Sequence, residues 1–231
     1  MCLMVLPTSD QAPLRDVATV ADCCLIASHR LAEWVSNAPS MEEDVAIGNI
    51  ALDLLGQARG LLSHLGDEDQ LAYFRDAVSF RNPVICELPN GDFAHTMLRQ
   101  LFLDVWLEQV WRAFAASDDE VVRGVAEKAI KENAYHRRHS SSWVVRLGDG
   151  TDESHRRMLA ALDELWPYCW EIAVDGWYDE VVFVLNTATL PTPAPPHADP
   201  QQAPRVDHTV HLTELLAEMQ SLARAHPGAS W

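Results

Sequence analysis

The sequence predicts an all-α protein, a four-helix bundle with additional shorter helices. Apolar residues recur every three or four positions through four long segments, which is the period of a helix with one buried face. Short stretches rich in Pro, Gly, Asn or Asp separate these segments, as expected for antiparallel neighbours in a bundle. The run VVFV at 181–184 has β propensity, but no second segment is available to pair with it.

Helices are predicted along nearly the whole chain. In order they cover residues 17–34, 41–65, 69–80, 92–116, then from the SDDE break at 117–120 to 147, then 152–166, 175–190 and 207–225. Ser40 and Glu43 form an S-x-x-E capping box before the second helix, and Gly66 ends it. The connector RNPVICELPNG at 81–91 holds two prolines and an Asn-Gly pair, so it is predicted to be non-helical.

A single domain, residues 1–231, is the simplest organisation, because the sequence shows no internal repeat. Its predicted parts are a main bundle (15–147), accessory helices (152–190), a Pro-rich linker (191–206) and a C-terminal helix (207–225). The linker sequence PTPAPPHADPQQAP carries six prolines and is predicted to be extended.

Composition excludes several classes of partner. The net charge of −17 argues against nucleic acids and anionic membranes, which require basic patches.

The sequence contains no run of about 18 apolar residues, so no transmembrane helix is predicted. The N-terminal sequence MCLMVLPTSDQAPLRD lacks the basic region of a signal peptide, so a cytoplasmic protein is expected. Five cysteines without a framework of spacings indicate reduced, mostly buried thiols.

Each of the four long helices places one carboxylate on a largely apolar face. These residues are Glu33, Asp53, Asp104 and Glu132. In the stretch KENAYHRRH, His136 follows Glu132 by four positions, so both side chains project from the same helix face. A buried carboxylate is costly unless it is paired or binds metal. One carboxylate per helix is the pattern of a di-iron centre in a ferritin-like bundle.

The ligand count does not complete such a centre. A ferritin-like site needs a Glu-x-x-His pair on each of two helices, and the second helix offers only Asp53 followed by Gly56 and Gln57. One imidazole is therefore missing, and a metal-free network of Asp53, Gln57, Glu132 and His136 is the alternative. Each carboxylate also has a structural alternative to metal binding. Glu33 can form an ion pair with Arg30, and Asp104 can contact a buried Arg.

Several blocks of the sequence carry a resemblance that spans nearly the whole chain. The blocks are RLAEWVSNAP, IALDLLGQARGLLSH, FRDAVSFRN, ELPNGDFAHTMLRQLFLDVW, KAIKENAYHRRHSSSWVVRLGDGTDES and LTELLAEMQSLARAHPGASW. Together they resemble the phenylacetate-degradation C subunit, a component of the multicomponent oxygenase that epoxidises the ring of phenylacetyl-CoA. The sequence departs from that family between LWPYCWEI and YDEVVFVLNTATLP, where the family carries a longer segment.

The resemblance implies a ferritin-like bundle that has lost its metal ligands. It implies no catalytic residue, metal or cofactor in this chain, and a scaffolding role toward a homologous catalytic A subunit that holds the di-iron centre. Other subunits of the complex supply electrons through flavin and iron–sulfur groups. Two rival hypotheses remain: a ferritin-like oxygenase that binds metal itself at a non-standard site, and a stand-alone ferritin-like binding protein.

Three tryptophans are candidates for contacts with a partner. Trp166, Trp170 and Trp177 gather around Pro167, and aromatic residues are enriched at interface hot spots. A locally packed aromatic cluster explains the same pattern.

Overall fold

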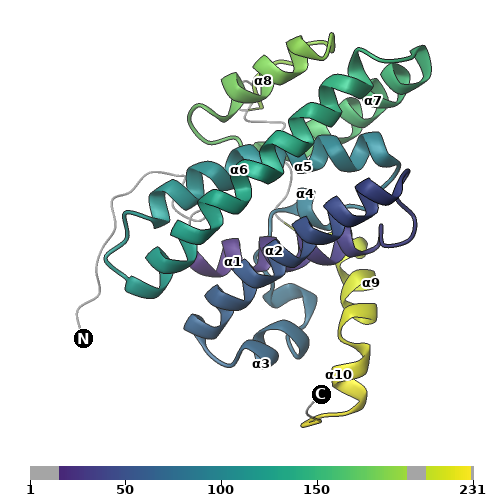
Figure 1. Ribbon diagram of the computed structural model, residues 1–231. Helices are drawn as coiled ribbons and strands as arrows, with labels where there is room; N and C mark the ends of the chain where they lie inside the picture. The colour runs from purple at the N-terminus through teal and green to yellow at the C-terminus, as the bar shows by residue number, and fades with distance from the viewer. Residues whose placement is uncertain (1–15, 197–206, 230–231) are drawn as a thin grey trace.

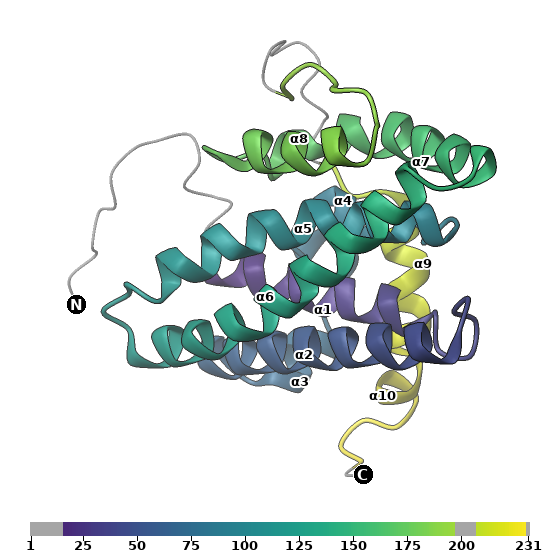
Figure 2. The same cartoon turned by 45° about the horizontal axis from the view of Figure 1, so that its top comes forward.

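Four long helices form the centre of the structure, a computed structural model that describes residues 16–196 and 207–229. They are α1 (Val17–Ala32), α2 (Met41–Leu65), α5 (Phe93–Phe114) and α6 (Glu120–Gly148). α1 pairs with α2, α5 pairs with α6, and α2 also packs along α6 (Figure 1 and Figure 2). No strand occurs in the described residues, so the predicted all-α fold is confirmed there.

Polar side chains cap the first turns of three of these helices. Ser40 accepts a hydrogen bond from the backbone N–H of Glu43, as predicted, and Asp92 and Asp119 cap α5 and α6 in the same way. The second half of the predicted capping box is wrong, because the Glu43 carboxylate bonds to His139 of α6 instead of returning to its own helix. A side chain that could satisfy its own helix end therefore ties two helices together.

The predicted helix over 69–80 is wrong beyond its first turns. The chain forms α3 (Glu68–Tyr73), then breaks, and makes one 3₁₀ turn, η2 (Ala77–Ser79). Arg75 lies in the break and donates hydrogen bonds to the fully buried carboxylate of Asp22 on α1. The helix therefore ends before Arg75, and the guanidinium of Arg75 compensates the charge of the buried Asp22 carboxylate.

The predicted connector over 81–91 also differs from the structure, because it contains a short helix, α4 (Val84–Glu87), after Pro83. All four residues of α4 are buried against α1, α5 and the C-terminal segment. The Asn-Gly pair that follows behaves as predicted, since Gly91 adopts a positive φ of 58°.

Shorter elements pack on the outside of the bundle, and two of them lie against α5 and α6. These shorter elements are α7 (Asp152–Leu165), the 3₁₀ segment η3 (Trp166–Glu171), α8 (Trp177–Thr187), α9 (Val210–Met219) and α10 (Ser221–Ala225). The single C-terminal helix predicted over 207–225 is wrong, because the chain breaks between α9 and α10. At this break the buried amide of Gln220 donates to the carbonyls of Ala72 and Arg75. Residues 197–206 of the predicted linker lie outside the described residues.

Aromatic packing joins α8 to the bundle. Trp177 is fully buried, donates its indole N–H to the carbonyl of Phe102 at 2.9 Å, and packs against Trp166 with ring centroids 5.8 Å apart. At this cluster the locally packed alternative is the one that the structure supports. A Cβ at Gly148 would collide with the carbonyl oxygen of Ala188, so the end of α8 approaches α6 more closely than any other residue would permit.

One continuous hydrophobic core runs from α1 through α9, and Trp106 and Trp111 lie fully buried within it. In the part of the chain that the structure describes, no helix is both long and apolar enough to cross a bilayer.

Candidate functional site

Facing polar side chains of α2 and α6 form a line of pairs, which we call the polar seam. It consists of Glu43, Asp53 and Gln57 on α2 and Glu132, His136 and His139 on α6. The two helices are antiparallel, so rising numbers on α2 meet falling numbers on α6. The pairs are Glu43–His139 at 2.8 Å, Asp53–His136 at 3.1 Å and Gln57–Glu132 at 3.0 Å.

His136 is the most deeply buried residue of the polar seam. Its side chain is fully buried, whereas that of its partner Asp53 remains 36% exposed. Burial lowers the pKa of His136, and the nearby carboxylate of Asp53 offsets part of this shift. When Nε2 carries the imidazole proton it donates to Asp53, and Nδ1 is then a buried acceptor without a hydrogen-bond partner in the described residues.

Gln57 and Lys128 saturate Glu132. The Gln57 amide donates to Oε2 of Glu132, and the Lys128 ammonium lies 2.9 Å from Oε1. The hydrogen bond with Glu132 raises the pKa of Lys128. On its other side, the carbonyl oxygen of Gln57 accepts from the Cys24 thiol of α1 at 3.6 Å. Both carboxylate oxygens of Glu132 thus face donors, one cationic and one neutral.

Asp104 lies apart from these pairs, in a fully buried cluster between α5 and α6. Its carboxylate accepts from Gln100 and Ser140, each at 2.7 Å, and Asn133 donates to its backbone carbonyl. Burial raises the pKa of Asp104 to about 7, with the two hydrogen bonds acting in the opposite direction. The predicted contact with a buried arginine is wrong, because the direct partners of this carboxylate are an amide and a hydroxyl.

The Asp104 cluster can hold either protonation state. When Asp104 is ionised, the Ser140 hydroxyl donates to it. When Asp104 is protonated, it can donate to Ser140, whose hydroxyl can then turn to the carbonyl of Arg137 at 3.3 Å. Neither state leaves this hydroxyl without a partner.

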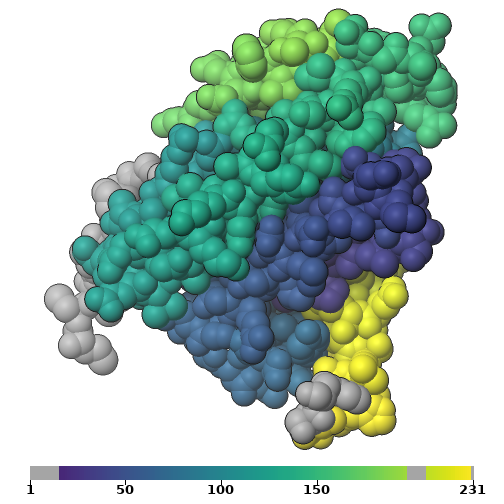
Figure 3. All heavy atoms as spheres, in the orientation of Figure 1, coloured from purple at the N-terminus to yellow at the C-terminus, as the bar shows by residue number. Residues whose placement is uncertain are grey.

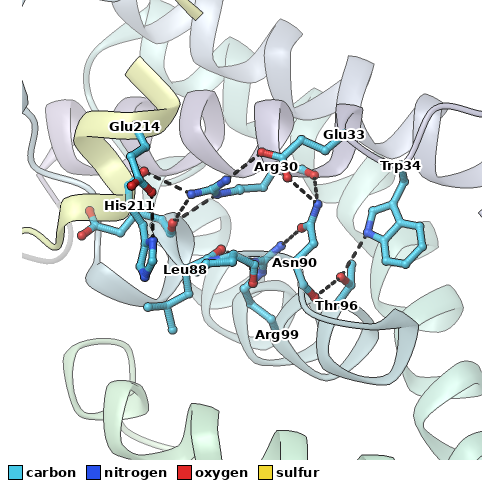
Figure 4. Close-up of polar contacts among 11 residues, drawn as sticks. Arg30, Glu33, Trp34, Leu88, Asn90, Thr96, Arg99, His211 and Glu214 are labelled. Atoms are coloured by element: carbon cyan, nitrogen blue, oxygen red, sulfur yellow. Dashed lines mark hydrogen bonds and ion pairs between the residues drawn. The ribbon is translucent and has the colours of Figure 1, made fainter. Parts of the chain in front are cut away.

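Glu33 does not join either group. It follows the last turn of α1, is exposed, and pairs with Arg30 at 2.7 Å and with the amide of Asn90 at 2.9 Å (Figure 4). The predicted ion pair with Arg30 is confirmed. Figure 4 also shows Arg99 reaching the same Asn90 and the carbonyl of Leu88. Burial lowers the pKa of Arg99 to about 10.

Two buried arginines therefore hold residues 87–89, since Arg30 donates to the carbonyl of Glu87 and Arg99 to those of Leu88 and Pro89. The contacts of Glu33 serve this structural clamp between α1, α4 and α5.

The side chains present do not fit a two-iron centre. Within the described ranges, no three His, Cys, Asp or Glu side chains come together as a metal would require. The donors are divided into closed pairs, and the oxygens of Glu132 already face an ammonium and an amide hydrogen. Of the predicted cluster, Asp53 meets His136 and Gln57 meets Glu132, while Asp104 and Glu33 lie elsewhere.

Sequence reasoning missed several polar residues. Glu43 was assigned to a helix cap, and Gln100 and Ser140 are uncharged and gave no signal on their own. Glu87 is completely buried in α4, where it accepts from His208 and Thr209 and so anchors the start of α9. It stands in a segment without periodicity, so its burial had no sequence signature.

Comparisons with known proteins identify the family of this chain. A family model described as "Phenylacetic acid catabolic protein" matches residues 5–176 and 173–231. The C subunit of the 1,2-phenylacetyl-CoA epoxidase of Escherichia coli (strain K12) is 41% identical in an alignment of length 244, which covers 92% of this chain and 96% of that protein. The two matched stretches overlap at 173–176, between η3 and α8, which is where the sequence departs from the resembling family.

Proposed function

Because the chain belongs to the phenylacetic acid catabolic protein family, we propose that it is a structural, non-catalytic subunit of a multicomponent di-iron oxygenase. The complex would epoxidise the aromatic ring of phenylacetyl-CoA during phenylacetate catabolism, in keeping with the name of the Escherichia coli relative. The observation that carries the non-catalytic role is the polar seam, where hydrogen-bonded pairs occupy the faces on which a ferritin-like protein would hold its metal.

The physical role of the polar seam is to fix the register of α2 on α6. Its three pairs are spaced along the helices, so a shift of either helix by one turn would leave buried polar groups without partners. A bundle with a unique register presents a rigid surface, and rigidity is what a scaffold contributes to a partner.

The partners in this proposal are the catalytic A subunit, which holds the di-iron centre, and the reductase subunits with flavin and iron–sulfur groups. No metal or cofactor resides in this chain, and the complex works in the cytoplasm. The charge of −17 supports a protein partner over nucleic acid or an anionic membrane, which would repel this surface.

The rival function is an oxygenase that binds metal itself. The observation in its favour is the buried and unpartnered Nδ1 of His136, beside a half-exposed Asp53. A metal on Nδ1 would leave the Asp53 contact at Nε2 in place and would still lack a second imidazole on α2.

Affinity purification of the tagged chain from its native host, followed by iron quantification on each separated chain, distinguishes the two functions. We expect a complex with a second helical-bundle subunit that holds the iron, and only traces of iron on this chain. About two irons per chain on this protein alone, lost in a Glu132→Ala, His136→Ala double variant, would overturn the proposal. Arg156→Ala, an exposed change on α7, serves as the control.

A further inference from the structure

The outer face of α2 carries an apolar row with no partner in the described structure, which we call the α2 stripe. It consists of Met41, Val45, Gly48, Leu52 and Leu55, at alternating spacings of four and three residues. This is the spacing of the core positions of a coiled coil. The side chains of Met41, Val45 and Leu52 are 81%, 58% and 65% exposed. In Figure 3, α2 lies on the near face beside α6, and no described segment crosses over it.

A groove of about 410 Å³ runs beside the α2 stripe. One wall is formed by Ser28, His29 and Ala32 of α1 with Val35 just after that helix, and the other wall by α2 residues between positions 45 and 55. The groove is lined mostly by apolar atoms. Its polar residues are Ser28, Asn49 and His29, and the Nε2 atom of His29 is buried without a hydrogen-bond partner among the described residues. The groove therefore offers mainly apolar area to an occupant.

Gly48 makes a hole in the middle of the α2 stripe. A Cβ built on it would meet nothing within 4 Å. Glycine inside a helix costs about 1 kcal/mol relative to alanine, and nothing in the described structure packs against this position to compensate. In a coiled-coil seam, such a hole receives a large side chain from the facing helix.

The charges around the α2 stripe select the occupant. Residues 41–55 contain four acidic residues and no Lys or Arg. Glu43 and Asp53 are used within the polar seam, whereas Glu42 and Asp44 flank the stripe. An occupant helix must therefore carry Lys or Arg beside its apolar face. A second copy of α2 provides no cation over these residues, and Arg59, beyond them, is already paired with Glu68.

We propose that the α2 stripe binds one amphipathic helix of the iron-bearing catalytic subunit. That helix places a large apolar side chain over Gly48 and basic side chains beside Glu42 and Asp44. This assignment rests on the proposed function, because it names the surface through which the scaffold holds its partner.

The test uses the purified chain and the purified catalytic subunit of the same host. Leu52→Lys places a cation in the centre of the stripe, and we expect it to raise the Kd by at least about tenfold, as for a buried interface anchor. Phe183→Lys is the matched control, because Phe183 is 71% exposed on α8, away from the stripe. Its Kd should stay within about twofold of the wild-type value. Circular dichroism checks that both variants fold.

A photo-cross-linking residue at Val45 identifies the occupant in the reconstituted complex. We expect the cross-linked peptide to come from a basic, amphipathic helix of the catalytic subunit. If Leu52→Lys binds as tightly as the wild type, the stripe assignment is overturned and the subunit role stands. If the wild type binds no catalytic subunit, both proposals fail. Cross-links between two copies of α2 would show that the stripe is a self-association surface and would also overturn the assignment.

Discussion

The inner and outer faces of α2 follow opposite rules. Toward α6 the helix presents the polar seam, in which Gln57 is buried and each seam residue has a hydrogen-bonded partner. Away from the bundle it presents the α2 stripe, in which Leu52 is 65% exposed. On these two faces the polar groups lie inside and the apolar groups outside, the reverse of the usual arrangement, while Ile47, Ile50 and Leu54 of the same helix fill the core in the ordinary way.

The reversal shows that two different energetic problems are solved on one helix. A buried polar group is tolerated when its partner is present, and every side chain of the polar seam has a partner within this chain, although the Nδ1 atoms of His136 and His139 have none among the described residues. An exposed apolar row is tolerated when a second molecule covers it, so the α2 stripe is complete only in an assembly. The inner face therefore concerns folding and the outer face concerns association.

A carboxylate added to the inner face should produce the largest loss of stability. Gln57→Glu removes the amide donor from Glu132 and places a second carboxylate beside it. The new carboxyl has a raised pKa, because burial and a like charge both favour its neutral form. The cost is therefore small at pH 5 and grows to about 3 kcal/mol at pH 8, as the group is forced to ionise. Urea unfolding at the two pH values measures it.

Asn49→Asp is the matched control for this change, since Asn49 is exposed on the same helix. Added charge at an exposed position should cost less than about 0.5 kcal/mol at either pH. Equal losses in the two variants would mean that the polar seam is no more sensitive to charge than the surface of α2.

Sequence patterns predicted the four long helices to within two residues at each end, because apolar periodicity reports burial directly. They failed where a side chain redirected the backbone. Arg75 broke the predicted helix over 69–80 to reach Asp22, and Gln220 broke the C-terminal helix. Such contacts join residues far apart in the chain, so no local window contains them.

The residues of the polar cluster were predicted more accurately than the pairs that they form. Asp53, Gln57, Glu132 and His136 share faces that helical periodicity identifies, and the structure brings all four to the same interface. Which residue meets which depends on the axial register of α2 against α6, and a sequence does not specify this. Glu33 was grouped with them by periodicity, but it lies beyond the last turn of α1 in solvent.

The Asp104 cluster is fully buried and gives a third site for the comparison. A substitution there should have an intermediate effect on the free energy of unfolding. The pKa of Asp104 rises from 3.8 to about 7 on folding, so the folded state holds a proton that the unfolded chain releases. This group stabilises the fold fully at low pH, and the contribution is lost as pH rises toward 7. Asp104→Asn lacks this titration and exchanges one acceptor for a donor.

We expect Asp104→Asn to cost about 1–3 kcal/mol at pH 5, where the native carboxyl is neutral and fully bonded. Between pH 5 and pH 8 the wild type should lose about 2 kcal/mol relative to the variant. His136 titrates in both proteins, so its opposite contribution cancels in the difference. A difference in unfolding free energy that stays constant across this range would show that Asp104 has an ordinary pKa in the fold.

The smallest expected change in stability comes from replacing one glycine on each face of α2 by alanine. A Cβ at Gly60 would lie 2.9 Å from a methyl of Val125 on α6, whereas a Cβ at Gly48 would lie in open space. Alanine gains about 1 kcal/mol of helix propensity at either position. Gly48→Ala should therefore stabilise the isolated chain by about this amount, while overpacking makes Gly60→Ala neutral or destabilising by about 1 kcal/mol. Thermal unfolding of both variants decides the sign, and stabilisation by Gly60→Ala would mean that α2 and α6 pack loosely at this point.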